Sequence, residues 1–384
     1  MTILVENRIM ANQRSFPHHM IKEIFEQPQG LHDTIAPRID QRAGRVQLNE
    51  VPISHEELRG LRRINIVASG TSRHAGMVGH YMIQELAGIP VDVDYASEFE
   101  YRNPMIGQGE LTIVITQSGE TADTTAAQRE ARGKGSRTVA ISNVAGATIA
   151  READGALYTL AGPEISIAST KAFTAQMAVL FLFGLYLGEV RGTLSKEQLT
   201  RYIADLQDVP NKLKIVLEAD PQCEQLAGKF KAFDDFMFMG RAIHYPVAMD
   251  GALKLKEVSY VHAEGYPTGE TKHGPIALID ENLPVVIIAT VDRGDAGSVM
   301  RYEKTLGNIQ GFKKQSGRVI ALATEGDTEV GKLADHTIFI PAAPELLSPI
   351  LEIVPLQLFA YYMAVKRGLD VDRPRNLVKS VTRE

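Results

Sequence analysis

A dense group of hydroxyl side chains follows a short apolar run, and hydroxyls in that position can hold an anion. The run is TIVITQSGETADT, residues 112–124, in which β-branched residues typical of a buried strand lead into Thr116, Gln117, Ser118 and Thr121. A loop that leaves a parallel strand and opens a helix is where α/β proteins bind ligands, and backbone N–H groups there suit phosphate. The alternative is that Ser118 or Thr121 only caps the following helix.

A second hydroxyl group, Gly70, Thr71 and Ser72, follows the predicted strand INIVA, residues 64–68. Two neighbouring strand ends that both carry Ser and Thr would converge on one anion or sugar. The sequence does not favour a nucleotide, because ASGTSRHAG lacks the third glycine of G-x-G-x-x-G and no G-x-x-x-x-G-K-[ST] occurs.

Charged groups for proton transfer occur later, in GALKLKEVSYVHAEGYPTGETKHGP, residues 251–275. Its helical beginning carries Lys254 and Glu257 on one face, and its Gly- and Pro-rich end carries His273. A carboxylate and an imidazole could act as general base and acid. The alternatives are a solvated i, i+3 ion pair for the first two and a structural hydrogen bond for His273.

Two other polar residues of this segment, His262 and Glu264, are predicted to be structural. No H-E-x-x-H, C-x-x-C or Asp-rich loop occurs, so the sequence predicts neither a metal site nor a cofactor.

The elements that must position these groups alternate between strand and helix. From Ile64 onward, β-branched runs alternate with helical segments at 74–87 and 121–132, which predicts a parallel, doubly wound sheet. A helical connector, broken at Pro210 and near Pro221, is expected over residues 195–231.

After this connector the alternation repeats, which predicts a duplicated domain. Four landmarks recur in the same order at spacings of about 170 to 181 residues: INIVASG with FMFMG, LTIVIT with LPVVIIAT, RTVAIS with RVIALA, and EADGALYTL with LADHTIFIP. Copy two has Arg241, Asp292 and Arg293 where copy one has its hydroxyls, so the anion site is predicted in copy one only.

The composition fits a cytoplasmic protein. Of 384 residues, 44% are hydrophobic and 23% charged, and the single cysteine, Cys223, allows no internal disulfide. No signal peptide is expected from MTILVENRIMANQRS, and the apolar run 178–188 is too short to span a bilayer. The net charge of −6 argues against general nucleic-acid binding.

Taken together, these motifs resemble the sugar isomerase (SIS) superfamily, and within it the isomerase half of glucosamine-6-phosphate synthases. The matching runs are SGTSRHAG, ASEFEYR, TQSGETADT, ISIASTKAFTAQ, GALKLKEVSYVHAEGYPTGETKHGPIALID and DVDRPRNLVKSVT. The resemblance implies an α/β fold of two tandem SIS domains, each a doubly wound five-stranded parallel sheet, and a homodimer with shared active sites. The expected divisions are an N-terminal helical segment (1–52), SIS domain 1 (53–194), the connector (195–231), SIS domain 2 (232–367) and a tail over the active site (368–384).

The resemblance also implies residue roles. Glu257 moves the proton between C1 and C2 of the sugar, His273 of the neighbouring subunit opens the ring, Lys254 steadies negative charge, and Lys379 either forms a Schiff base or orients the open chain. The implied phosphate and sugar contacts are Gly70, Thr71, Ser72, Thr116, Gln117, Ser118, Thr121, Ile167 and Ser169.

The implied activity is sugar-phosphate isomerisation between fructose 6-phosphate and glucosamine 6-phosphate. The family's glutaminase domain, with its N-terminal cysteine nucleophile, is not expected in a chain that begins Met1–Thr2, so nitrogen would come from free ammonia or a separate glutaminase. Two alternatives stay open. One is a glucosamine-6-phosphate deaminase, and the other is a sugar-phosphate-sensing module, although residues 1–52 carry six basic and six acidic side chains and so form no basic arm.

Overall fold

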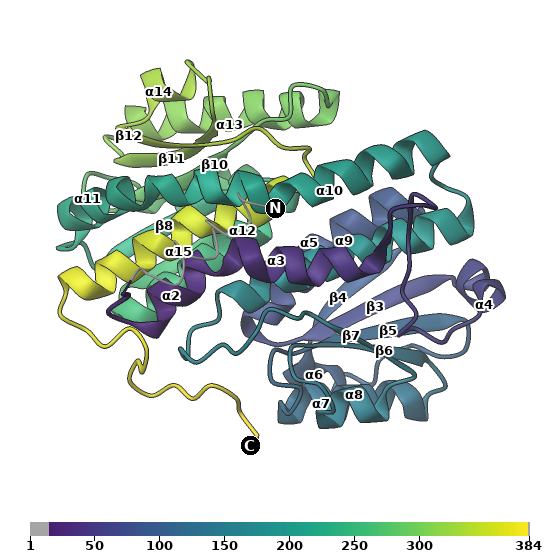
Figure 1. Ribbon diagram of the computed structural model, residues 1–384. Helices are drawn as coiled ribbons and strands as arrows, with labels where there is room; N and C mark the ends of the chain where they lie inside the picture. Colours follow the sequence, from purple (N-terminus) through teal and green to yellow (C-terminus); the bar gives the residue numbers. More distant parts are fainter. Residues whose placement is uncertain (1–14, 383–384) are drawn as a thin grey trace.

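Two five-stranded, all-parallel sheets form the framework of the computed structural model, which describes residues 15–382 (Figure 1). The strand orders are β4-β3-β5-β6-β7 and β9-β8-β10-β11-β12, so the two sheets have one topology. Each neighbouring pair is parallel. The predicted duplication and α/β fold class are therefore confirmed. The strands are β3 (Arg63–Ala68), β4 (Val91–Tyr95), β5 (Glu110–Ile115), β6 (Arg137–Ser142), β7 (Gly155–Tyr158), β8 (Asp235–Gly240), β9 (His262–Pro267), β10 (Val285–Ala289), β11 (Val319–Thr324) and β12 (His336–Ile340).

Helices cover both faces of each sheet and fill the space between them (Figure 1). The central layer contains α2 (His19–Phe25), α3 (Gln27–Ile35), α5 (Gly70–Ala87), α9 (Lys171–Arg191), α10 (Lys196–Val216), α11 (Asp220–Phe230), α12 (Tyr245–Ser259) and α15 (Ser348–Lys366). The outer helices are α6 (Ala96–Phe99), α7 (Ala122–Gly133) and α8 (Thr148–Glu152) on the first sheet, and α13 (Ala296–Lys314) and α14 (Val330–Leu333) on the second. The remaining elements are the short α4 (His55–Gly60), the hairpin β1 (Ile39–Asp40) with β2 (Arg45–Val46), and the 3₁₀ turns η1 (Ala36–Arg38), η2 (Leu217–Ala219), η3 (Ala242–His244), η4 (Thr268–His273) and η5 (Pro275–Leu278).

The inner faces of both sheets share one hydrophobic core. Alternate residues of each strand point inward, as in β3 with Ile64 and Ile66 and in β8 with Phe236 and Phe238, and all four side chains belong to a single buried cluster with the central helices. The other strand residues, such as Val67, pack outward in separate clusters against the outer helices. The two copies are thus joined through apolar packing across the central layer.

The connector differs from its prediction at Pro210. Helix α10 continues through this proline without a break, while the second predicted break is confirmed where α11 begins at Asp220. A proline inside a helix costs about 3 kcal/mol. Burial of Leu213 and Val216 beyond the proline offsets this cost, because a helix that ended at Pro210 would no longer hold these two side chains in the core.

Strand β9 is an element that the sequence analysis did not predict. It is the edge strand of the second sheet and pairs in parallel with β8. Its sequence, HAEGYP, contains no β-branched residue, so propensity gives no signal there. His262 and Glu264 lie on this strand, where His262 Nδ1 is 2.9 Å from Asp235 Oδ1 and Glu264 accepts a hydrogen bond from Tyr266 Oη.

Two helices, α9 and α15, are long and apolar enough to cross a membrane by length and composition alone. Buried residues make up 83% and 89% of their most apolar windows, which is the burial of core helices. The run 178–188 is therefore part of a longer helix than expected, and its apolar character is explained by the core. The expectation about a signal peptide concerns residues that lie largely outside the described range.

Candidate active site

The hydroxyl cradle, defined here as Thr116, Ser118 and Thr121, lies at the carboxyl end of β5. Thr116 Oγ1 is 2.8 Å from Thr121 Oγ1 and 3.5 Å from Ser118 Oγ, so the three hydroxyls face one another. Thr121 is the N-cap residue of α7, but its side chain makes no capping hydrogen bond. The capping alternative is therefore wrong for Thr121.

A glycine gives the cradle its shape. Gly119 has φ +72°, and a Cβ at this position would lie 2.3 Å from the Cβ of Ala147, so no other residue fits there. Gln117 is half-buried, and its carbonyl accepts a hydrogen bond from the Asn143 N–H group at 3.1 Å.

The second predicted hydroxyl group lies at the neighbouring strand end, in the first turn of α5. Gly70 there has φ +52°, Thr71 is buried, and Ser72 Oγ accepts a hydrogen bond from Gln176 Nε2 at 3.1 Å. Because β3 and β5 are adjacent, Ser72 and the cradle share one edge of the sheet. Gln176 comes from α9 and was missed, since nothing local in the sequence marks it.

The loop 164–169, which carries Ile167 and Ser169, lies after β7 and is held by two buried carboxylates. Glu164 Oε1 accepts hydrogen bonds from the N–H groups of Thr170 and Ala172, at 2.9 and 3.1 Å. Glu23 Oε1, from α2, accepts hydrogen bonds from the N–H groups of residues 165 and 166. Ile167 and Ser169 are themselves half-buried, and the Ile167 N–H group donates a hydrogen bond to the Asp372 carbonyl at 3.0 Å.

The C-terminal tail lies against both of these regions. Lys379 Nζ is 2.6 Å from Glu164 Oε2 and donates a second hydrogen bond to the Ser166 carbonyl at 2.8 Å. The next residue, Ser380, has its Oγ 2.9 Å from Ser118 Oγ. The tail therefore connects the hydroxyl cradle with the loop 164–169.

Copy two contributes a buried ion pair from α12. Lys254 Nζ is 2.5 Å from Glu257 Oε2; the lysine side chain is fully buried and that of the glutamate is 21% exposed. The alternative of a solvated surface pair is therefore wrong. Burial alone would lower the pKa of Lys254, but the charges of Glu257, Asp250 and Glu164 outweigh it and raise that pKa.

Charges from the two copies meet in this cluster. Glu164, in copy one, acts on Lys254 of copy two, and His74 Nδ1 of α5 is 3.0 Å from the buried Oδ1 of Asp250 on α12. Burial alone would raise the pKa of Glu164, but the charge and hydrogen bond of Lys379 and two backbone N–H groups lower it, so this carboxylate is ionised. Two carboxylates, Glu164 and Glu257, thus come together with Lys254, Lys379 and a set of hydroxyls.

His273 is the predicted catalytic residue that the structure does not bring into this cluster. It ends the 3₁₀ turn η4 and is exposed, and its side chain forms no hydrogen bond or ion pair within residues 15–382. The alternative of a structural hydrogen bond therefore has no support in the described part of the chain.

The corresponding strand ends of copy two are filled by the chain's own charges. His244 lies between Glu352 and Glu345, at 2.8 and 3.2 Å, and Thr290 donates a hydrogen bond to Glu352. Burial alone would lower the pKa of His244, but the two carboxylates raise it to about 10. Burial alone would raise the pKa of Glu345, but His244, Ser298 and Arg301 lower it to about 2. Since carboxylates already occupy this region, it needs no bound anion.

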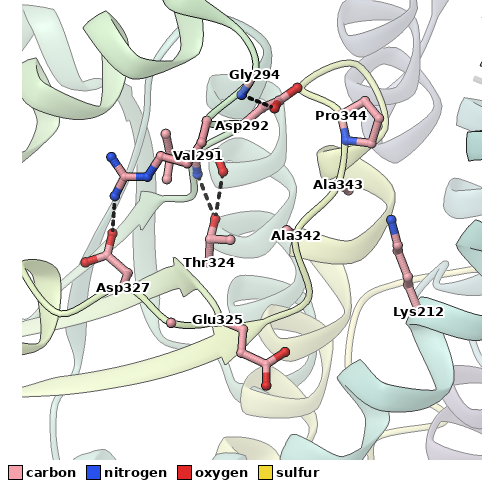
Figure 2. Close-up of a pocket in the computed structure, with 12 residues that line it drawn as sticks. Lys212, Val291, Asp292, Gly294, Thr324, Glu325, Asp327, Ala342, Ala343 and Pro344 are labelled. Carbon is pink, nitrogen blue, oxygen red and sulfur yellow. Dashed lines mark hydrogen bonds and ion pairs between the residues drawn. The ribbon is translucent and has the colours of Figure 1, made fainter.

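A pocket of about 520 Å³ opens beside this network, at the ends of β10, β11 and β12 (Figure 2). Its charged groups are largely paired: Arg293 faces Asp327 at 3.5 Å, and Asp292 accepts a hydrogen bond from the Gly294 N–H group. Lys212 and Arg293 also line the pocket, but it has no group of converging hydroxyls like the cradle of copy one among the residues that line it. No group of three His, Cys, Asp or Glu side chains is placed to hold a metal ion in residues 15–382.

Comparisons with known proteins agree with this fold. The model of the SIS domain family matches residues 57–185 and 234–367. The glutamine–fructose-6-phosphate aminotransferase (isomerizing) of Chlorobaculum tepidum is 49% identical over 96% of this chain, and that of Thermus thermophilus is 46% identical over 97%. The chain spans only 59% and 60% of the length of these two relatives.

Two solved structures are also similar. The C-terminal domain of the glucosamine–fructose-6-phosphate aminotransferase of Francisella tularensis is 35% identical, with a TM-score of 0.87 over 94% of this chain and 99% of that one. A glucosamine-6-phosphate deaminase of Thermotoga maritima has a TM-score of 0.70 over 95% of this chain and 99% of its own, at 21% identity, which is a likeness of fold alone.

Proposed function

The chain belongs to the SIS domain family, and on this premise we propose that it is a sugar-phosphate isomerase of the glucosamine-6-phosphate synthase type. Its reaction would convert fructose 6-phosphate and ammonia into glucosamine 6-phosphate and water. The observation that carries the proposal is the buried Lys254–Glu257 pair, whose charge cluster includes the Glu164–Lys379 pair beside the hydroxyl cradle.

The phosphate would bind at the two strand ends of copy one. The cradle hydroxyls and Ser72 can each donate to a phosphate oxygen, and Gly70, Thr71 and Gln117 border the same edge. Ser380 already contacts Ser118, so a bound phosphate would meet the tail as well. Ile167 and Ser169 would contact the sugar chain.

Glu257 would carry the proton between the two sugar carbons. The C2 carbonyl of the open ketose condenses with ammonia, the carboxylate removes a proton from C1, and the same proton is delivered to C2 to give the aldose. Only its Oε2 is held by Lys254; the other oxygen, Oε1, makes no hydrogen bond in the described residues and is free to accept. Lys254 would steady the negative charge that develops next to it.

Lys379 and His273 would complete the site. Lys379 either forms a Schiff base with the ketone or orients the open chain. His273 is exposed and has no side-chain partner within residues 15–382, so its role in ring opening would require a second copy, and we include a homodimer in the proposal. A cytoplasmic location fits the single free cysteine, which is buried.

The test offers the purified chain three mixtures: fructose 6-phosphate with ammonium, fructose 6-phosphate with glutamine, and glucosamine 6-phosphate alone. Glucosamine 6-phosphate from the first mixture supports the synthase direction, and ammonia release from the third supports a deaminase. A glutamine-dependent product would require a glutaminase activity that we do not assign to these residues. Binding of both sugar phosphates without any turnover would refute the proposal and favour a sensing module.

A further inference from the structure

The Glu164 carboxylate is held in place by the backbone and interacts with both lysines of the candidate site, Lys254 and Lys379. The Glu164 side chain is completely buried, and one oxygen, Oε1, is held by the N–H groups of Thr170 and Ala172 at the start of α9. The second oxygen, Oε2, is therefore directed by the backbone, and it holds Lys379 Nζ at 2.6 Å. The position of this oxygen does not depend on the tail.

The position of the C-terminal tail depends on the contact between Lys379 and Glu164. Within residues 369–382 few side chains are buried, and Val378 and Val381 are 64% and 49% exposed, so apolar packing contributes little to holding the tail near the cradle. The polar contacts nearest Lys379 are its own two bonds, the Ser380–Ser118 contact and the Val381 carbonyl, which accepts a hydrogen bond from the Ala122 N–H group at 3.0 Å. Only the contact with Glu164 joins two full charges, one of them buried.

We propose that Glu164 is a positioning residue that holds Lys379, and with it the end of the tail, over the hydroxyl cradle. The same buried charge acts on Lys254, so one carboxylate sets the place of an ammonium group from the tail and stabilises one from copy two. The part of the inference that concerns turnover rests on the proposed function. The part that concerns tail docking can be measured without any substrate.

Glu23 provides a matched control for Glu164. It is also a buried carboxylate that holds the loop 164–169, through the N–H groups of residues 165 and 166, but it does not contact the tail. Its second oxygen, Oε2, is buried without a hydrogen-bond partner. Glu23→Gln therefore keeps an acceptor for both N–H groups, and it changes a charge near the loop without touching Lys379.

Hydrogen exchange at the Ala122 amide reports tail docking directly. Ala122 is the first residue of α7, so its N–H group has no acceptor within the helix, and its partner is the Val381 carbonyl. The Thr125 amide, which donates to the Thr121 carbonyl inside the same helix, serves as an internal reference. We expect Glu164→Gln to speed exchange at Ala122 by about tenfold or more relative to Thr125, and Glu23→Gln to leave it unchanged.

Turnover gives the second readout. If Glu164 acts through Lys379, Glu164→Gln should lower kcat by about tenfold or more with KM changed less than about threefold, because the hydroxyl cradle still holds the phosphate. Adding Lys379→Ala to Glu164→Gln should then cost little more than Lys379→Ala alone.

Three results would overturn the proposal: unchanged exchange at Ala122 in Glu164→Gln, the same acceleration in Glu23→Gln, or additive losses of kcat. If Glu164→Gln does not fold, Lys379→Met tests the same contact from the exposed tail, and protection of Ala122 equal to wild type would again refute it. If the wild-type chain turns over no sugar phosphate, the proposed function fails while the exchange experiment still decides whether Glu164 docks the tail.

Discussion

The buried Lys254–Glu257 pair makes an asymmetric prediction about two substitutions. Glu257→Gln leaves a fully buried ammonium group without its nearest partner, whereas Lys254→Met leaves a carboxylate that is 21% exposed and can be hydrated. Both variants should lose turnover, because one removes the proposed base and the other removes the group beside it. Glu257→Gln should also be the less stable of the two variants. In a surface ion pair, by contrast, the loss of either partner would hardly change the stability.

The magnitude follows from what remains around each group. Removing one partner of a buried pair costs about 3–5 kcal/mol, because the other charge is left buried and uncompensated. Asp250 and Glu164 still act on Lys254 in Glu257→Gln, so we expect the lower end, about 3 kcal/mol. At roughly 2 cal/mol/K of unfolding entropy per residue, that corresponds to a fall in Tm of about 3–4 °C for a chain of 384 residues. Lys254→Met should lower Tm by less than Glu257→Gln does, because the Glu257 carboxylate that it leaves is 21% exposed and can be hydrated.

The assay combines thermal unfolding of the ligand-free protein with kcat for the sugar phosphate. Glu257→Gln should lose about 10²- to 10⁴-fold in kcat, the usual scale for a general base. A Glu257→Gln variant with wild-type Tm and near wild-type kcat would refute both the buried pair and the catalytic role. A Lys254→Met variant less stable than Glu257→Gln would refute the assignment of the cost to the buried ammonium group.

Three further predictions test other parts of the structure. Ser118→Ala combined with Thr121→Ala should raise KM for the sugar phosphate about tenfold with little loss of stability, since Thr121 makes no capping bond; an unchanged KM would remove the phosphate from the cradle. Deletion of residues 375–384, or Lys379→Ala alone, should abolish most turnover with little change in Tm; turnover within about threefold of wild type would contradict this, because that is under 1 kcal/mol of barrier. For His244 the folded pKa of about 10 lies above the ordinary 6.5, so its stabilisation, on the order of 5 kcal/mol, is full below pH 6.5 and is lost as pH rises toward 10. Denaturant unfolding should show this decline in the wild type and a weaker one in His244→Gln, and equal slopes would contradict the assignment.

Local patterns were sufficient to predict the framework. The strands β3, β5, β6 and β7 and their counterparts in copy two are β-branched or apolar runs, and the hydroxyls that follow β5 stand out in the sequence because they interrupt such a run. What failed depended on tertiary context. The edge strand β9 forms because β8 offers it a pairing edge, and α10 passes through Pro210 because its apolar face is buried.

The site was predictable only where a residue's own neighbours mark it. Lys254 and Glu257 share a helical face, and this spacing is visible in the sequence. Glu164 and Glu23 became recognisable only in the folded chain, because the first acts on Lys379, 215 residues away, and the second holds a loop 142 residues away. A carboxylate before a hydroxyl-rich loop gives a weak signal, since such residues are commonly solvated.

The two copies have diverged in a way that makes them interdependent. In copy two, Glu345 and Glu352 surround His244 at the strand ends, so these strand ends carry no hydroxyl cradle that could bind phosphate. Helix α12 of copy two instead directs Lys254 and Glu257 toward copy one, and His74 of copy one meets Asp250 of the same helix. Either copy alone would hold only part of the chemistry and would expose the face that both now bury in a common core. Separated copies should therefore be poorly soluble as well as inactive, because each would expose its half of the common core.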